Sequence, residues 1–184
     1  MLILALDTST SAIGVAVLAT GSDPVVGVEV DARAHTEKLA PLVRDTLAAA
    51  GATPAELTGI AVGTGPGPFT GLRVGLVTAV TMGLALGIPV HGVCSLDALA
   101  EQALADAPAD VTELLVATDA RRKEVYWARY GRGGDGAAAL GEPAVDRPAE
   151  LPDDVRALPT VGRGPLLYPD LFAHPFCLMD AADP

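Results

Sequence analysis

Carboxylate and hydroxyl side chains gather at the end of the first apolar segment of the sequence. Asp7, Thr8 and Ser9 directly follow a predicted strand at residues 2–6. Carboxylates hold Mg²⁺ and closely spaced backbone N–H groups hold phosphate, so this turn could contact a nucleotide. The same residue types also close hairpin turns without any ligand. Both interpretations stay open for weak nucleotide binding, and we expect no turnover.

A second Asp stands at the end of another predicted strand. The same shift along the sequence aligns Asp119 with Asp7 and Val125 with Ile13. Each of the two aligned segments has a predicted strand, an Asp at its end, a polar turn and a second strand. This agreement favours an internal duplication. A duplicated βββαβα unit with an acid after each first strand is the plan of actin-like ATPases (ASKHA, ribonuclease H-like), the α/β fold class that we expect here. In that plan the two hairpins clasp the phosphates of ATP.

The second turn carries cations where nucleotide-binding hairpins carry glycine. Arg121, Arg122 and Lys123 form the densest basic cluster of the sequence. Their bulk would spoil a close backbone cradle for phosphate, although the charges could meet an anion. A solvated turn is an equally good interpretation.

A glycine-rich loop and a helix follow the fourth predicted strand. The loop at residues 63–69 precedes a helix N-terminus, where free N–H groups favour anions. Two prolines remove donors from it, so we interpret it as a stiff segment that positions Phe69 and Arg73. The helix then carries small residues at every fourth position: Gly71, Gly75, Ala79, Gly83 and Gly87. Glycine in a helix interior costs about 0.5–1 kcal/mol relative to alanine, so this ridge needs a compensating contact. Internal packing and a subunit interface would supply it equally well.

Histidine and cysteine patterns give no catalytic or metal centre. The three histidines are His35, His91 and His174, and no two have ligand spacing. No Ser or Cys nucleophile has a partner pattern around His35, which we interpret as a residue at the start of a helix. We therefore predict no metal site and no catalytic residue.

Composition restricts the class of protein. Half of the 184 residues are hydrophobic but only 4% are aromatic, which favours parallel sheets covered by helices. A formal net charge of −11 opposes tight, direct binding of nucleic acid by this chain alone. Two cysteines and a first segment without basic residues lead us to expect a cytoplasmic location. The uncharged stretch 74–90 contains Gly and Pro, so we expect a buried helix and a strand, and no membrane.

Periodicity and turn residues predict the elements that must position these residues. Strands are expected at residues 2–6, 12–18, 25–30, 59–62, 89–93, 114–118 and 124–130, and helices at 36–50, 70–86 and 95–104. We expect residues 131–141, with their many glycines, to form a flexible loop. We place a first lobe, which includes the helices of the candidate interface, at 1–105 and a reduced second lobe at 106–184.

Four segments together resemble one family: residues 5–10 (ALDTST), 35–39 (HTEKL), 63–75 (GTGPGPFTGLRVG) and 119–126 (DARRKEVY). They are similar to TsaB, or YeaZ, a bacterial subunit needed to make threonylcarbamoyladenosine next to the anticodon of tRNA. The resemblance implies a noncatalytic paralogue of the transferase TsaD that binds TsaD, is joined by TsaE, and forms a homodimer when alone. It also implies that tRNA is reached only through the complex.

The resemblance also bears on the site residues. It favours the interface reading of the glycine ridge, with contact through the helix at 70–86 and the one before it. The partner-binding residues are then expected to be: His35, Leu39, Leu42, Phe69, Gly71, Arg73, Gly75, Ala79 and Gly83. Arg121, Arg122 and Lys123 could touch tRNA phosphate or an acid of the partner. No cofactor is required, and weak ATP or ADP binding at the TsaD interface would use Asp7, Thr8, Ser9 and Asp119.

Two other functions compete with this one, and one feature departs from the family. A glycoprotease-like or small-molecule kinase-like enzyme would need paired histidines or glycine-rich hairpins. A self-associating regulatory homodimer would use the same helices against a second copy. Family members continue into a further helix and closing strand, whereas this sequence stops at Pro184. We therefore expect the second lobe to lack these two elements.

Overall fold

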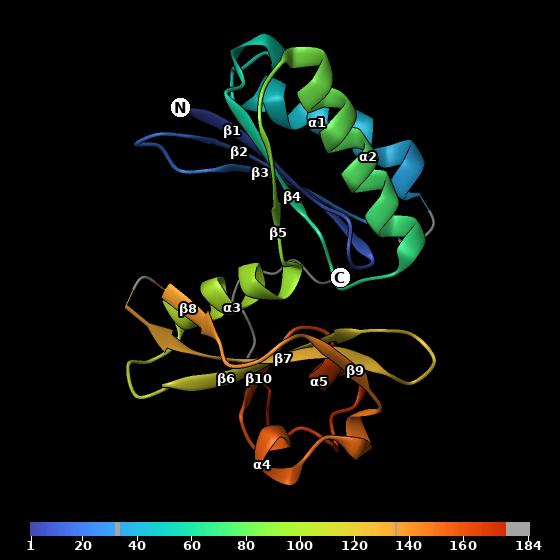
Figure 1. The fold of residues 1–184 in the computed structure, drawn as a ribbon, viewed down its shortest axis with the longest axis vertical. Coiled ribbons are helices and arrows are strands. Elements are labelled where there is room, and N and C mark those ends of the chain that lie inside the picture. The colour runs from blue at the N-terminus through green and yellow to red at the C-terminus, as the bar shows by residue number, and fades with distance from the viewer. Residues whose placement is uncertain (32–33, 135, 176–184) are drawn as a thin grey trace. The chain divides into compact units, whose positions relative to one another are not determined.

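The computed structural model describes residues 1–31, 34–134 and 136–175 (Figure 1). The chain divides into two compact units, one of residues Met1–Val93 and one that starts at Cys94. Each unit has its own mixed β-sheet.

The first unit contains the predicted elements in the predicted order. They are β1 (Leu2–Asp7), β2 (Ala12–Ala19), β3 (Val25–Val30), α1 (His35–Ala49), a 3-10 turn (Pro54–Glu56), β4 (Gly59–Gly63), α2 (Phe69–Leu86) and β5 (Val90–Val93). The sheet order is β3-β2-β1-β4-β5. β1, β2 and β3 form the expected antiparallel meander, and β4 and β5 add parallel strands.

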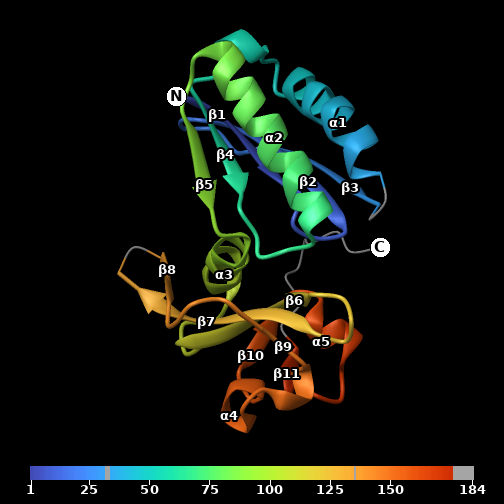
Figure 2. The same ribbon diagram turned by 45° about the vertical axis from the view of Figure 1, so that its right-hand side comes forward.

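Both long helices of this unit lie on the same side of its sheet (Figures 1 and 2). Alternate residues of each strand point to that side, as the period of two requires. The core consists of fully buried aliphatic side chains of the strands and of α1: Leu4, Leu6, Ile13, Val15, Val17, Leu39, Val43, Leu47, Ile60 and Val62. Burial of each such side chain is worth about 1.5–3 kcal/mol, so this layer holds the helices in place.

The second unit repeats the strand plan of the first with shorter helices. Its elements are α3 (Ser95–Asp106), β6 (Glu113–Asp119), β7 (Val125–Gly133), β8 (Gly136–Ala139), β9 (Ala144–Asp146), a 3-10 turn (Pro148–Glu150), α4 (Asp153–Arg156), β10 (Pro159–Val161), α5 (Gly164–Leu167) and β11 (His174–Pro175). The sheet order is β11-β10-β6-β7-β8, with β9 also paired to β7. β6 thus takes the place of β1, and Asp119 and Asp7 are the last residues of these two strands.

Two sequence predictions differ from the structure here. The helix α3 packs in the second unit, because Leu96, Ala100 and Ala103 join the cluster formed by β6 and β7, so this unit starts at Cys94 and not near residue 106. The stretch 131–141, predicted as a flexible loop, contains the end of β7 and all of β8. A hydrogen bond of 2.6 Å from the Ala137 N–H to Glu101 Oε2 ties β8 to α3. The predicted lack of a last helix and strand concerns the end of the chain, where residues 176–184 lie outside the described part.

Candidate functional site

The polar groups of the turn after β1 form hydrogen bonds within the first unit. Asp7 Oδ1 accepts hydrogen bonds from the Ser9 N–H at 2.7 Å and from the Ser9 hydroxyl at 2.6 Å. The Thr8 hydroxyl donates to the Gly71 carbonyl at 2.8 Å and accepts from the Gly75 N–H at 3.2 Å. Thr8 and Ser9 are 1% and 3% exposed. The expectation that these two side chains contact a nucleotide is therefore corrected, and only Asp7 is partly exposed.

The ridge of small residues on α2 is internal. A Cβ atom added to Gly71 would lie 2.6 Å from the Thr8 carbonyl oxygen, and one added to Gly75 would overlap the Thr8 hydroxyl. At Gly83 it would overlap Val90, and Ala79 is fully buried. The close contact that these residues need is thus supplied by β1, its turn and β5. Our prediction that this ridge touches a partner is wrong, and internal packing explains it.

Three α1 residues assigned to partner binding also lie inward. Leu39 belongs to the core, and Leu42 packs against it from a half-buried position. The buried His35 ring donates from Nε2 to the Thr10 carbonyl oxygen at 3.0 Å, because a carbonyl can only accept. His35 therefore fastens the start of α1 to the β1–β2 turn.

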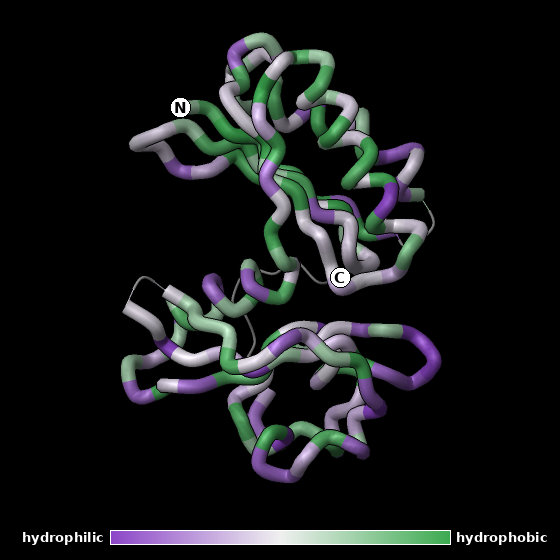
Figure 3. The backbone as a smooth tube through the Cα atoms, in the orientation of Figure 1, coloured by the Kyte–Doolittle hydropathy of each residue, from purple (hydrophilic) through white to green (hydrophobic). Residues whose placement is uncertain are grey.

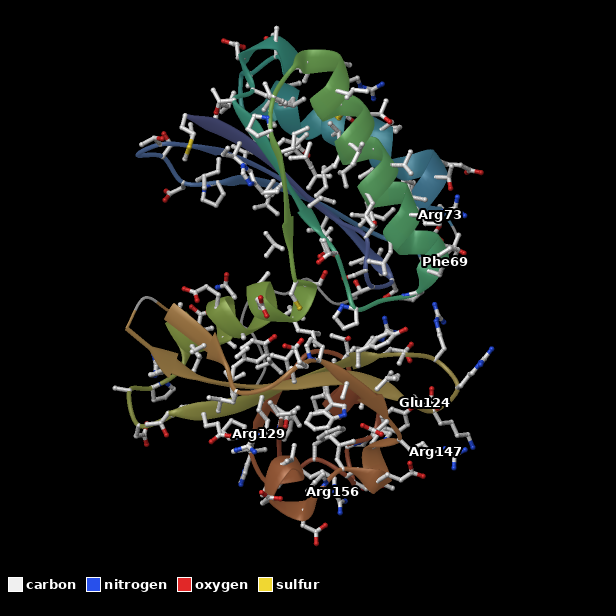
Figure 4. The ribbon with its side chains drawn as sticks, viewed as in Figure 1. Phe69, Arg73, Glu124, Arg129, Arg147 and Arg156 are labelled. Atoms are coloured by element: carbon white, nitrogen blue, oxygen red, sulfur yellow. The ribbon has the colours of Figure 1, made fainter. Side chains whose placement is uncertain are left out.

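The opposite side of α2 is exposed and apolar. Phe69, Val77, Val80 and Leu84 are 73%, 59%, 55% and 85% exposed, and their spacing places them in one row along the helix. The Arg73 guanidinium lies in the same row, with its central carbon 5.2 Å from the centre of the Phe69 ring (Figure 4). Figure 3 shows the apolar character of α2 along much of its length. We call these five residues the outer face of α2.

An open groove runs beside the outer face, between α1 and α2. Its volume is about 420 Å³. The residues that line it come from the two helices: Thr36, Leu39, Ala40, Phe69, Thr70, Arg73, Val74, Val77 and Thr78. The sequence analysis identified Phe69 and Arg73 but missed Val77, Val80 and Leu84. They follow Arg73 at successive intervals of four, three and four residues, and this helical spacing is the signal that could have found them.

The second hairpin holds its turn with the other repeated Asp. Asp119 Oδ1 accepts a hydrogen bond of 2.8 Å from the Arg121 N–H. Arg121, Arg122 and Lys123 are exposed at the tip. Within the described residues, no group of three or more His, Cys, Asp and Glu side chains is arranged to hold a metal ion.

The helix α2 is long and apolar. By these two criteria alone the helix could cross a bilayer. Its small-residue ridge packs on a sheet, however, and core helices of soluble proteins pass the same criteria. The helix is therefore weak support for a membrane span, and its outer face calls for another explanation.

The repeated sheet order and the repeated Asp define an actin-like ATPase fold. A family model described as TsaD, tRNA N6-adenosine threonylcarbamoyltransferase, matches residues 25–157. A solved Pseudomonas aeruginosa protein described as similar to the peptidase YeaZ has a TM-score of 0.79 at 33% identity, over 95% of this chain and 81% of that one. The Escherichia coli tRNA threonylcarbamoyladenosine biosynthesis protein TsaB is 38% identical over 93% of this chain and 75% of its own length. The chain belongs to the TsaB (YeaZ) family.

Higher identity occurs with longer proteins. An uncharacterized protein of Mycobacterium tuberculosis is 49% identical over 81% of this chain, which spans 66% of that protein. Another, from Mycobacterium leprae, is 47% identical over 96% of this chain, which spans 46% of it. The chain is thus shorter than these relatives.

Proposed function

We propose that this chain is a noncatalytic subunit that binds TsaD and thereby supports threonylcarbamoyl modification of the adenosine next to the anticodon of tRNA. The biological process is inferred from the names of its relatives, since TsaB of Escherichia coli is a tRNA threonylcarbamoyladenosine biosynthesis protein. The observation that carries a binding role is the outer face of α2. A row of large apolar side chains in water is the mark of a protein interface.

The outer face suits a helix of a partner protein. Burial of a Leu, Val or Phe side chain is worth about 1.5–3 kcal/mol, and α2 offers four of them beside the groove next to α1. α1 and α2 would therefore form a helical bundle with apolar helices of TsaD. Arg73 lies in the same row, between Phe69 and Val77, and an acidic side chain of the partner could pair with it.

The polar groups of the hairpin turns support a noncatalytic role. Thr8 hydrogen bonds join the β1–β2 turn to α2, and the Ser9 hydroxyl is bonded to Asp7. These groups would have to leave their partners before they could bind a phosphate. We therefore propose that no cofactor is required and that any ATP or ADP binding, through Asp7 and Asp119, is weak.

The wider assembly follows from the same proposal. TsaE joins the pair, tRNA is bound by the complex rather than by this acidic chain alone, and the location is the cytoplasm. In the absence of TsaD, the outer face of one copy would pair with that of a second copy. A substitution on this face should therefore weaken both associations.

Reconstituted tRNA modification tests the proposal. We expect a reconstituted threonylcarbamoyl modification assay with purified TsaD and TsaE to give modified tRNA only when this chain is added. Leu84→Asp should lose most of the stimulation because it places a charge in the interface. Leu166→Asp is the matched control, since Leu166 is 62% exposed on α5 of the other unit. Equal product without this chain, or ATP hydrolysis by the pure chain, would contradict the proposal.

A further inference from the structure

The turn between β6 and β7 presents three cations on an unusual backbone. Arg121, Arg122 and Lys123 have φ values of 64°, 51° and 66°, the left-handed region that residues with a Cβ atom disfavour. Hydrogen bonds from the Ala120 N–H to the Glu124 carbonyl oxygen, and from the Glu124 N–H to the Arg121 carbonyl oxygen, close the turn at 3.0 and 2.8 Å. The cations therefore sit at a defined tip and not on a loose loop.

Two of the three cations are uncommitted. The Arg121 Nε atom lies 3.9 Å from Asp119 Oδ2, so that charge has a partner. In the described part of the chain, neither the side chains nor the backbone N–H groups of Arg122 and Lys123 have a hydrogen-bond or ion-pair partner. The tip thus ends in two free positive charges and two free N–H donors.

Most of the other described Lys and Arg side chains already form ion pairs or hydrogen bonds. Lys38, Arg44, Arg129, Arg147 and Arg156 each pair with a carboxylate, and Arg132 donates to backbone carbonyls. The net charge of the whole chain is −11. Arg122 and Lys123 are therefore a local exception on an acidic protein, and Figure 3 shows the turn as a hydrophilic tip.

The chemistry of the tip fits a phosphate group better than a protein surface. Stable protein interfaces have an apolar centre, and Val125, the nearest large aliphatic residue in sequence, is fully buried. Phosphate contacts need only cations and N–H donors, which is what Arg122 and Lys123 offer. Asp119 and Glu124 flank the tip, so we expect contact with one or two phosphates rather than a long track.

We infer that Arg122 and Lys123 bind phosphate groups of tRNA when this chain is in complex with TsaD. This inference rests on the proposed function, because the RNA is the substrate of the complex. The tip adds a contact to RNA that the rest of the complex holds. The isolated chain, with its excess of acids, has no comparable affinity.

The test is tRNA affinity of the complex at several salt concentrations. The variant is Arg122→Asn with Lys123→Asn, because Asn tolerates the left-handed backbone and carries no charge. We expect its affinity at 50 mM salt to fall about three- to tenfold. The slope of log affinity against log salt should become shallower by about 1.4–1.8, which is the loss of two phosphate contacts. The control, Arg147→Asn, removes a positive charge from an exposed ion pair of the second unit and should change affinity less than about twofold.

Light scattering of each variant with TsaD, without RNA, separates the outcomes. If the wild-type chain does not join TsaD, the proposed function fails, and this inference fails with it. If the Asn variant joins TsaD normally but binds tRNA with the wild-type affinity and salt slope, only this inference is overturned. Weaker association with TsaD in the absence of RNA would make the turn a protein contact, which also overturns it. A double Gly variant at the same positions, which relieves the backbone, should reproduce the Asn result if charge is the cause.

Discussion

The Thr8 hydroxyl connects the first strand to the helix that bears the proposed interface. It lies between the Gly71 carbonyl and the Gly75 N–H and bonds to both. Gly71 and Gly75 leave the space that this contact needs. A residue that looks like a nucleotide ligand in the sequence therefore has a structural role.

Thr8→Val tests that role. Valine keeps the shape but leaves two buried backbone groups without this partner, so we expect the free energy of unfolding to fall by about 1–3 kcal/mol. Urea unfolding followed by circular dichroism measures the change. Thr81→Val on the exposed side of the same helix should stay within about 0.5 kcal/mol. Equal effects of the two substitutions would show that the Thr8 hydroxyl does not fasten α2.

Gly75→Ala separates helix propensity from packing. Alanine favours an α-helix by about 1 kcal/mol over glycine, yet its Cβ would overlap the Thr8 hydroxyl. Overpacking costs about 1–3 kcal/mol, so we expect net destabilisation. Combining it with Thr8→Ala removes the obstructing oxygen, and the double variant should be more stable than the sum of the single effects predicts. Additive losses would contradict the contact.

The helix α2 has a buried side and an exposed side. The small-residue ridge faces the sheet, and the outer face carries Phe69, Val77, Val80 and Leu84. The first side fixes the helix, and the second is free to bind. This division replaces our expectation that one glycine ridge mediates association.

The sequence predicted the extent of α2 but not its orientation. Its boundaries follow from the proline before Phe69 and from Gly87, which ends the helix in the left-handed conformation. Apolar residues surround the helix on nearly all sides, so no polar face indicates which side meets water. The strand β8 was missed for a different reason. Its pairing with β7 and the Glu101 hydrogen bond are nonlocal, while its own sequence, Gly-Ala-Ala-Ala, has low strand preference.

The contact between α3 and β7 should make the folded state less stable at alkaline pH. Tyr130 is 1% exposed, and its hydroxyl donates to Asp97 Oδ1 at 2.6 Å. Burial raises the pKa of the Tyr130 phenol, and the hydrogen bond to Asp97 raises it further. The folded state thus keeps the phenol neutral. Its contribution is complete below the unfolded pKa near 10 and is lost as pH rises through the folded pKa.

Tyr130→Phe should remove this dependence. Above pH 10 the wild-type free energy of unfolding should fall more steeply than that of the variant, by up to about 1.4 kcal/mol per pH unit. Near neutral pH the variant should be less stable by about 1 kcal/mol, because one hydrogen bond is lost. Urea unfolding from pH 7 to 11 measures both. Parallel pH profiles would contradict the buried neutral phenol.

The duplication was predictable because a repeated Asp marks the same place in both units. The two sheets confirm it, since β6 occupies in one sheet the position that β1 occupies in the other. The unit boundary was not predictable, because the apolar face of α3 would fit either neighbouring sheet. Among the expected site residues, Phe69 and Arg73 are exposed, whereas the partners of Gly71 and Thr8 could only be seen once the chain was folded.

We propose above that the outer face of α2 binds TsaD. Light scattering of mixed, purified proteins measures it directly as molar mass. The wild-type chain and the Leu166→Asp control should give the mass of a complex with TsaD. Val77→Asp combined with Leu84→Asp should leave two separate species, while its circular dichroism stays that of a folded protein. A complex of undiminished mass and stability with that double variant would contradict the claim.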